Sequence, residues 1–125
     1  MKTLSAADIL RVNDIKVEPV DVPEWGGRVY VREFSAAKRE EYDAQFFDAD
    51  GNPQEVSNVR AKVVAFAACD ENGKPLFTVD HVHILAEKSD AAVHRVFDVA
   101  ARLNKLRRQD REIEKKESVT PPPAG

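Results

Sequence analysis

The sequence has little of what marks exported or membrane-spanning proteins. It contains one cysteine, Cys69, so no disulfide can form within the chain, and the apolar stretch AFAAC around it indicates an inert, buried thiol. The opening MKTLSAADIL lacks the long apolar run of a signal peptide, and no uncharged apolar stretch approaches the roughly 20 residues that cross a bilayer. We therefore expect a soluble protein of a reducing cytosol that is not exported and has no membrane partner.

An excess of positive charge is also missing. The 19 lysines and arginines face 22 aspartates and glutamates, which gives a formal net charge of -3 at pH 7. Proteins that bind nucleic acid without sequence preference need a basic surface, so nucleic acid is not an expected partner. With 42% apolar and 33% charged residues, a chain of this length has enough apolar side chains for one core.

The first residues predict a short helix. In SAADILRVN, Ser5 stands at a capping position and Asp8 at the spacing of a capping box, which satisfies free backbone N–H groups at the start of a helix. This helix then offers three apolar side chains that we expect to pack against the rest of the chain: Ile9, Leu10 and Val12.

A β-hairpin is predicted over residues 15–34. Apolar residues alternate with polar ones on both sides of Trp25-Gly26-Gly27, and glycine tolerates the positive φ angles of tight turns. Pro19 cannot donate a backbone hydrogen bond, so the first strand belongs at a sheet edge. Apolar residues occupy odd positions before Glu18-Pro19 (15 and 17) and even positions after it (20 and 22). This shift in the alternation predicts a bulge or kink at that point.

The rest of the folded part has helical periodicity. Ser35, Thr78 and Ser89 each precede a helical pattern as N-cap residues. The nearly continuous apolar run before Asp70 indicates that one of these helices is the most buried element. The sequence thus predicts an α+β fold, mainly α, with a helical core of about four to five helices and an N-terminal two-stranded antiparallel β-hairpin. The helices after the hairpin are expected over residues 36–48, 56–69, 79–87 and 90–106.

A single globular domain is expected over residues 1–106. Beyond it, RRQDREIEKKE carries one apolar residue and opposite charges three and four residues apart, which predicts a charged helical extension over residues 107–117. The three prolines of SVTPPPAG cannot continue a helix, so residues 118–125 are expected to form a disordered, proline-rich tail.

No set of residues in the sequence predicts catalysis, a cofactor or a metal. The chain has no GxSxG, HExxH or GxGxxG pattern. A calcium loop at DADGNP would need glutamate at its twelfth position, which is Val59. Residues i and i+2 point about 200° apart on a helix, so His81 and His83 on one helix would not face the same ion. No zinc site is therefore assigned to Cys69, His81, His83 and His94.

Aromatic residues are the candidates for contact with a partner. Neighbours on a helix diverge by about 100°, so Phe46 and Phe47 both enter the core only if the apolar face is wide. We expect both in the core, with one of them near the surface as the alternative. Trp25 either covers the hairpin or meets a partner, since tryptophan is enriched at interfaces. The candidate partner-binding residues are Trp25, Tyr30, Phe46 and Phe47.

Three blocks in succession resemble one known family. DVPEWGGRVYVREFSAAKREEY, NVRAKVVAFAACDENGKPLF and HILAEKSDAAVHRVFDVAARLNKL are similar to the tail assembly chaperones of long-tailed bacteriophages and prophages, over roughly residues 3–108. The resemblance implies a non-enzymatic protein that binds the tape measure protein and keeps it soluble until tail tube subunits polymerise around it. It also implies action in the cytoplasm of the bacterial host and absence from the mature virion.

Two points stay open beside this resemblance. The tail tube protein and a second copy of the chain are further partners to consider. The alternative function is that of a structural virion protein, either a tail tube or a head-tail connector subunit. Such subunits usually devote more of the chain to strands than the single hairpin predicted here, which favours the chaperone.

Overall fold

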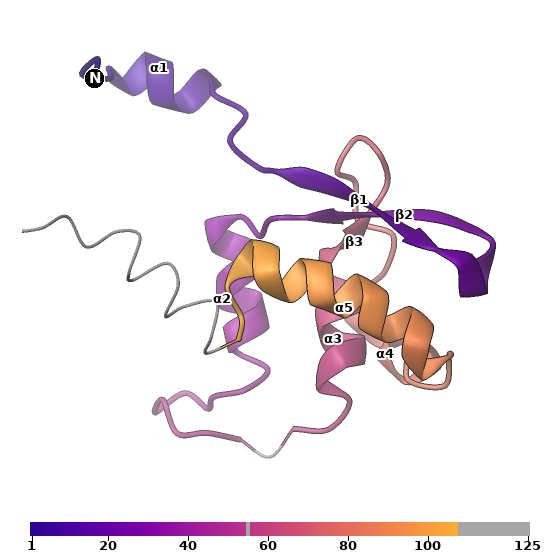
Figure 1. Cartoon of the computed structure of the whole chain (residues 1–125). Helices are drawn as coiled ribbons and strands as arrows, with labels where there is room; N and C mark the ends of the chain where they lie inside the picture. Colours follow the sequence, from indigo (N-terminus) through magenta and orange to yellow (C-terminus); the bar gives the residue numbers. More distant parts are fainter. Residues whose placement is uncertain (55, 108–125) are drawn as a thin grey trace, which may run out of the picture.

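The structure is a computed structural model that describes residues 1–54 and 56–107 (Figure 1). Within these ranges the chain forms helices and a small antiparallel sheet, so the predicted α+β, mainly α fold is confirmed. The helices are α1 (Ala6–Arg11), α2 (Ala36–Asp43), α3 (Val59–Ala67), α4 (Val82–Leu85) and α5 (Asp90–Asn104). The strands are β1 (Val17–Val22), β2 (Gly27–Arg32) and β3 (Ala68–Cys69), and short 3-10 helices form at η1 (Pro23–Trp25) and η2 (Val79–His81).

β1 and β2 form the predicted hairpin, and β1 lies at the edge of the sheet. The strand order is β1-β2-β3, so Pro19 stands on an edge strand, where a missing donor is tolerated. The pairing with β2 runs without interruption along all of β1. The bulge predicted at Glu18-Pro19 is therefore wrong. The change of parity instead puts Val17 on the opposite face of the sheet from the buried Val20 and Val22.

A third strand replaces the end of the helix predicted over residues 56–69. α3 ends at Ala67, and the next two residues pair with β2, Ala68 opposite Val31 and Cys69 opposite Tyr30. The run AFAAC has no periodicity that separates a buried helix from a buried strand, so the pairing with β2 decides its conformation. Among the described residues the sheet therefore has three strands, where the sequence predicts two.

The core lies between the sheet and two helices. α5 crosses one face of the hairpin and packs against α3 (Figure 1). Alanines of α3 and α5 are also buried, and their small side chains let the two helices approach each other closely. The sheet and both helices contribute side chains with 0% exposure: Val22, Val31, Val63, Val64 and Val96.

The remaining helices differ from prediction at their ends. α2 begins after the predicted cap Ser35, whose hydroxyl oxygen accepts a backbone N–H at 3.1 Å, but it ends at Asp43 instead of residue 48. The segment predicted as one helix over residues 79–87 is divided into η2 and α4. No helix of the described part is long and apolar enough to cross a membrane. The predicted extension and tail, from residue 108 onward, lie outside the described residues.

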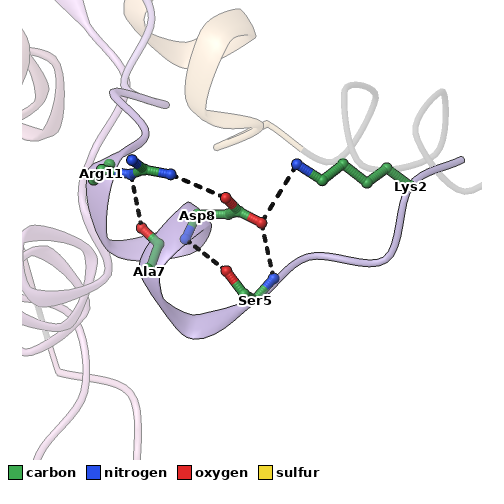
Figure 2. Close-up of polar contacts among 5 residues, drawn as sticks. All are labelled: Lys2, Ser5, Ala7, Asp8 and Arg11. Carbon is green, nitrogen blue, oxygen red and sulfur yellow. Dashed lines mark hydrogen bonds and ion pairs between the residues drawn. The ribbon is translucent and has the colours of Figure 1, made fainter.

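α1 is formed by local contacts and stands away from the rest of the chain (Figure 1). Ser5 and Asp8 form the predicted capping box, with the Ser5 N–H donating to the carboxylate at 3.0 Å and the Asp8 N–H donating to the hydroxyl oxygen at 3.2 Å (Figure 2). Lys2 and Arg11 also contact this carboxylate. The packing predicted for the apolar side chains of this segment is wrong, because local capping forms the helix without burying them. Their exposed fractions are 55% for Ile9, 85% for Leu10 and 58% for Val12.

Candidate partner-binding surfaces

The turn of the hairpin determines the position of Trp25. After η1 the chain reverses at Gly26, whose φ of 73° lies in the left-handed region that glycine adopts readily. The Gly26 N–H donates to the Pro23 carbonyl oxygen at 3.0 Å, which closes the turn. Trp25 then packs half-buried against the core. The partly buried indole fits the first of the two roles left open for Trp25, the covering of the hairpin, and contact with a partner stays a prediction.

A hollow of about 320 Å³ lies beside Trp25, between the hairpin tip and α4. Apolar and aromatic side chains form most of its walls, and one of them, Ile84, is 48% exposed. A partly exposed apolar wall is what an apolar side chain of a partner needs for burial. We call this hollow the Trp25 pocket, and its lining residues are Trp25, Phe77, His81, Ile84, Leu85 and Lys88.

Local hydrogen bonds hold one wall of the Trp25 pocket in place. The Thr78 N–H donates to Nδ1 of His81 at 3.0 Å, which orients the imidazole ring at the start of η2. The His81 ring then meets Phe77 nearly edge-on, with 5.7 Å between ring centroids. Both rings are half-buried, so this wall is preformed.

An ion pair fastens the hairpin tip to α5. Arg95 Nε lies 2.9 Å and 3.0 Å from the two carboxylate oxygens of Glu24 in η1. The backbone N–H of Glu24 itself, and then the Arg95 guanidinium, hold the pKa of the Glu24 carboxyl below its ordinary value. The carboxylate therefore stays charged and paired at neutral pH, which keeps the tip beside the Trp25 pocket.

Phe46 and Phe47 lie in different environments. Phe46 is half-buried against the core, with its ring centroid 4.7 Å from that of Tyr42. Phe47 is 46% exposed. The expectation that both enter the core is wrong, because α2 ends at Asp43 and the chain turns before the second ring can reach the core. The alternative, one phenylalanine near the surface, describes Phe47.

A second hollow, of about 580 Å³, lies beside Phe47. Phe47, Ala44 and Ala49 supply apolar surface, and Gln54 also lines the hollow. The other lining residues are acidic: Glu40, Asp43 and Asp48. We call this the Phe47 hollow.

The four predicted partner-binding residues do not share one groove. Tyr30 lies half-buried in the middle of β2, between Pro19 and Cys69 on the neighbouring strands. Trp25 is at the hairpin tip and Phe47 follows α2, and these two places lie at opposite sides of the molecule (Figure 1). The structure therefore separates the candidates into two surface hollows and two sites packed within the fold.

Of the residues that line the Trp25 pocket, only Trp25 is in the predicted set, and the partly accessible apolar residues Phe77 and Ile84 are absent from it. Val82 and Leu85 are three residues apart on α4 and are both buried, which identifies the inward face of this short helix. Ile84 lies about 100° from Leu85 around the helix axis, outside that face. An aliphatic residue beside a helix stripe is the signal that could have identified it as exposed.

The residues considered for zinc lie in ordinary structural positions. Cys69 is 1% exposed in β3, and burial raises the pKa of its thiol. The His94 ring on α5 lies against Phe97, with 6.0 Å between ring centroids. Within residues 1–54 and 56–107, no three of the histidine, cysteine, aspartate and glutamate side chains are grouped closely enough to hold a metal ion.

Comparisons with known proteins agree on one family. A model of the phage tail assembly chaperone family matches residues 5–117. The tail assembly chaperone of bacteriophage HK97 has a similar fold, with a TM-score of 0.52 and 22% sequence identity, over 74% of this chain and 85% of that one. No curated protein matches. Since the family model spans nearly the whole chain, this protein belongs to the phage tail assembly chaperones, whose role is in assembly and is not enzymatic.

Proposed function

We propose that this chaperone binds the tape measure protein of its phage and keeps it soluble until the tail tube forms around it. The site of action is the cytoplasm of the bacterial host, and the chaperone leaves before the virion is complete. The observation that carries the proposal is the Trp25 pocket, an accessible apolar hollow on a member of the tail assembly chaperone family.

The pocket suits an apolar side chain on a client helix. A helix that lays its apolar face on a partner inserts side chains spaced three or four residues apart into hollows of this kind. Trp25, Phe77 and Ile84 offer broad apolar walls, and tryptophan is among the residues that dominate binding energy at interfaces. His81 and Lys88 supply polar groups at the same site, which suits an amphipathic client.

Little ordering is needed before the client binds. The Glu24–Arg95 ion pair holds the hairpin tip, and the Thr78–His81 hydrogen bond holds the opposite wall. A preformed site avoids the entropy loss of ordering loops on binding, so more of the burial energy contributes to affinity.

Co-expression with the tape measure protein tests the proposal. The chaperone should raise the soluble fraction of that protein, and Trp25→Ala and Ile84→Ser should reduce the effect. Val79→Ser is the matched control, because Val79 is also an exposed aliphatic residue, at 51%, but does not line the pocket. Thermal unfolding of each variant separates lost binding from lost folding.

Two results would contradict the proposal. If the wild-type chaperone leaves the soluble yield of the tape measure protein unchanged, that protein is not its client. Detection of the chaperone in purified virions, at the copy number of a ring subunit, would favour the alternative of a structural virion protein.

A further inference from the structure

Phe47 is held in an exposed position by the loop that follows α2. The backbone of Phe47 pairs with Pro53, and the Gln54 side-chain amide donates to the Phe47 carbonyl oxygen at 2.7 Å. Asp48 Oδ1 accepts the N–H groups of Asp50 and Asn52, each at 2.9 Å. These hydrogen bonds fix the conformation of the loop. The folded loop itself therefore holds the Phe47 ring at the surface.

The surroundings of Phe47 combine apolar surface with negative charge. Ala44 and Ala49 extend the apolar area of the ring across the hollow. Glu40, Asp43 and Asp48 bring three carboxylates to the same hollow, and no lysine or arginine lines it among the described residues.

One basic residue, Arg39, stands next to this hollow, but the net charge of the hollow stays negative. Arg39 Nε lies 3.2 Å from Asp43 Oδ1, so one of the three carboxylates is paired. Beside Glu40 and Asp48, the described lining of the hollow contains no lysine or arginine. An apolar group that enters the hollow therefore meets a surplus of negative charge at its edge.

We infer that the Phe47 hollow binds a positively charged amphipathic segment of the client, in which an apolar side chain is flanked by lysine or arginine. The apolar side chain packs on Phe47, and the flanking cations reach the carboxylates of Glu40 and Asp48. Complementary charge of this kind selects among apolar segments and raises the rate of encounter. The identity of the client as the tape measure protein rests on the proposed function.

Two separate contacts suit a long client better than one. The hairpin tip and the segment that follows α2 lie at opposite sides of the molecule (Figure 1). The Trp25 pocket is lined from the first and the Phe47 hollow from the second, so one short helix does not fill both. A long chain can occupy both hollows with different segments, and the second contact then forms at a high effective concentration. The Phe47 hollow thus adds retention of the client together with selectivity for basic segments.

Binding of two synthetic helical peptides tests the hollow itself. Both peptides carry leucines at helical spacing, flanked by lysines in one and by glutamates in the other, and their affinity for the full-length chaperone is measured by fluorescence anisotropy. The lysine peptide should bind more tightly, and its affinity should fall as salt is raised, because salt screens exposed charges. Equal binding of the two peptides would overturn the inference.

Variants of neighbouring residues provide the matched control. Glu40→Lys should weaken binding of the lysine peptide by about fivefold, since exposed ion pairs contribute modestly and reversal adds repulsion. Glu41→Lys makes the same change of net charge one residue away, outside the hollow, and should have little effect. Phe47→Ala should weaken binding by about tenfold, as expected for an aromatic anchor. Identical effects of Glu40→Lys and Glu41→Lys would overturn the inference.

Capture of the tape measure protein separates this inference from the proposed function. If the wild-type chaperone retains that protein and neither Glu40→Lys nor Phe47→Ala changes retention, the inference fails and the proposed function stands. If the wild-type chaperone does not retain it, the proposed function fails, and the peptide comparison still decides the chemistry of the hollow.

Discussion

The side chain of Asn104 accepts a hydrogen bond from the backbone N–H of Phe34, with 2.7 Å between nitrogen and Oδ1. The same side chain donates through Nδ2 to the carbonyl oxygens of Arg32, at 3.2 Å, and Ala100, at 3.1 Å. Asn104 is the one buried polar residue in the part of the chain that the structure describes. It therefore joins the end of α5 to the chain that leaves β2, inside an otherwise apolar core.

Replacement of Asn104 by alanine should destabilise the fold. The change leaves the N–H of Phe34 and the carbonyl of Arg32 without these partners, and buried unpaired groups of this kind cost about 2 kcal/mol. Urea denaturation monitored by circular dichroism measures the loss. Asn72→Ala, at an exposed turn, is the control and should change the free energy of unfolding by less than about 0.5 kcal/mol. Equal losses for the two variants would show that the buried contacts of Asn104 contribute nothing.

Alanine at the adjacent phenylalanines should separate stability from client binding. Phe46→Ala removes a half-buried ring that packs on Tyr42, so we expect a loss of about 2 kcal/mol in the free energy of unfolding. Phe47→Ala removes an exposed ring and should leave that free energy within about 0.5 kcal/mol of wild type. Thermal unfolding compares the variants. A large loss for Phe47→Ala would place this ring in the core.

Substitution on α1 should leave the stability of the main body unchanged. Leu10 is 85% exposed, so Leu10→Ser should shift the free energy of unfolding by less than about 0.5 kcal/mol. Val96 on α5 is 0% exposed, and Val96→Ala should cost about 2 kcal/mol through lost burial and the cavity that remains. Parallel urea titrations of the two variants are the measurement. Similar losses would mean that α1 packs on the body in solution.

α1 should unwind selectively in acid. The pKa of Asp8 lies below its ordinary value because the Ser5 N–H and then the Ser5 hydroxyl donate to the carboxylate, with Arg11 and Lys2 also in contact. A carboxyl whose pKa is lowered on folding stabilises the folded form above its unfolded pKa. That contribution is lost as the pH falls through the lowered pKa, so the capping box should open there while α5 remains helical.

An NMR titration measures this transition at the Ser5 amide. Its resonance should shift with an apparent pKa below the ordinary aspartate value, together with loss of helical carbon shifts in α1. Asp8→Asn cannot titrate and should show no such step. A Ser5 transition at or above the ordinary aspartate pKa would rule out the capping contact in solution.

Several local features could be predicted from the sequence because few residues decide them. Ser35 and Ser89 accept the N–H groups of Lys38 and Ala92, three residues ahead, as their positions before helical patterns indicate. The hairpin turn follows from Gly26, which adopts its positive φ without help from distant contacts. These features need only neighbours within one turn of the chain.

The candidate site could be predicted only in part. Residue type alone predicts Trp25 and Phe47 as contact candidates, and both line surface hollows. Their separation was not predictable, because it depends on where α2 ends and on how the hairpin lies over α4. Phe77 and Ile84 were not predictable as site residues for the same reason, since their pocket forms only where η1 and α4 lie side by side.

The sequence by itself determined where α1, α2 and α5 begin, where the hairpin turns and which family the chain resembles, because caps, glycine turns and residue order are properties of near neighbours. Only the tertiary structure decided that Ala68 and Cys69 join the sheet and that the apolar side chains of α1 stay exposed. It also decided that Phe46 packs against the core while Phe47 lies at the surface. Strand pairing and burial depend on residues far apart in the chain, and these are brought together only when it folds.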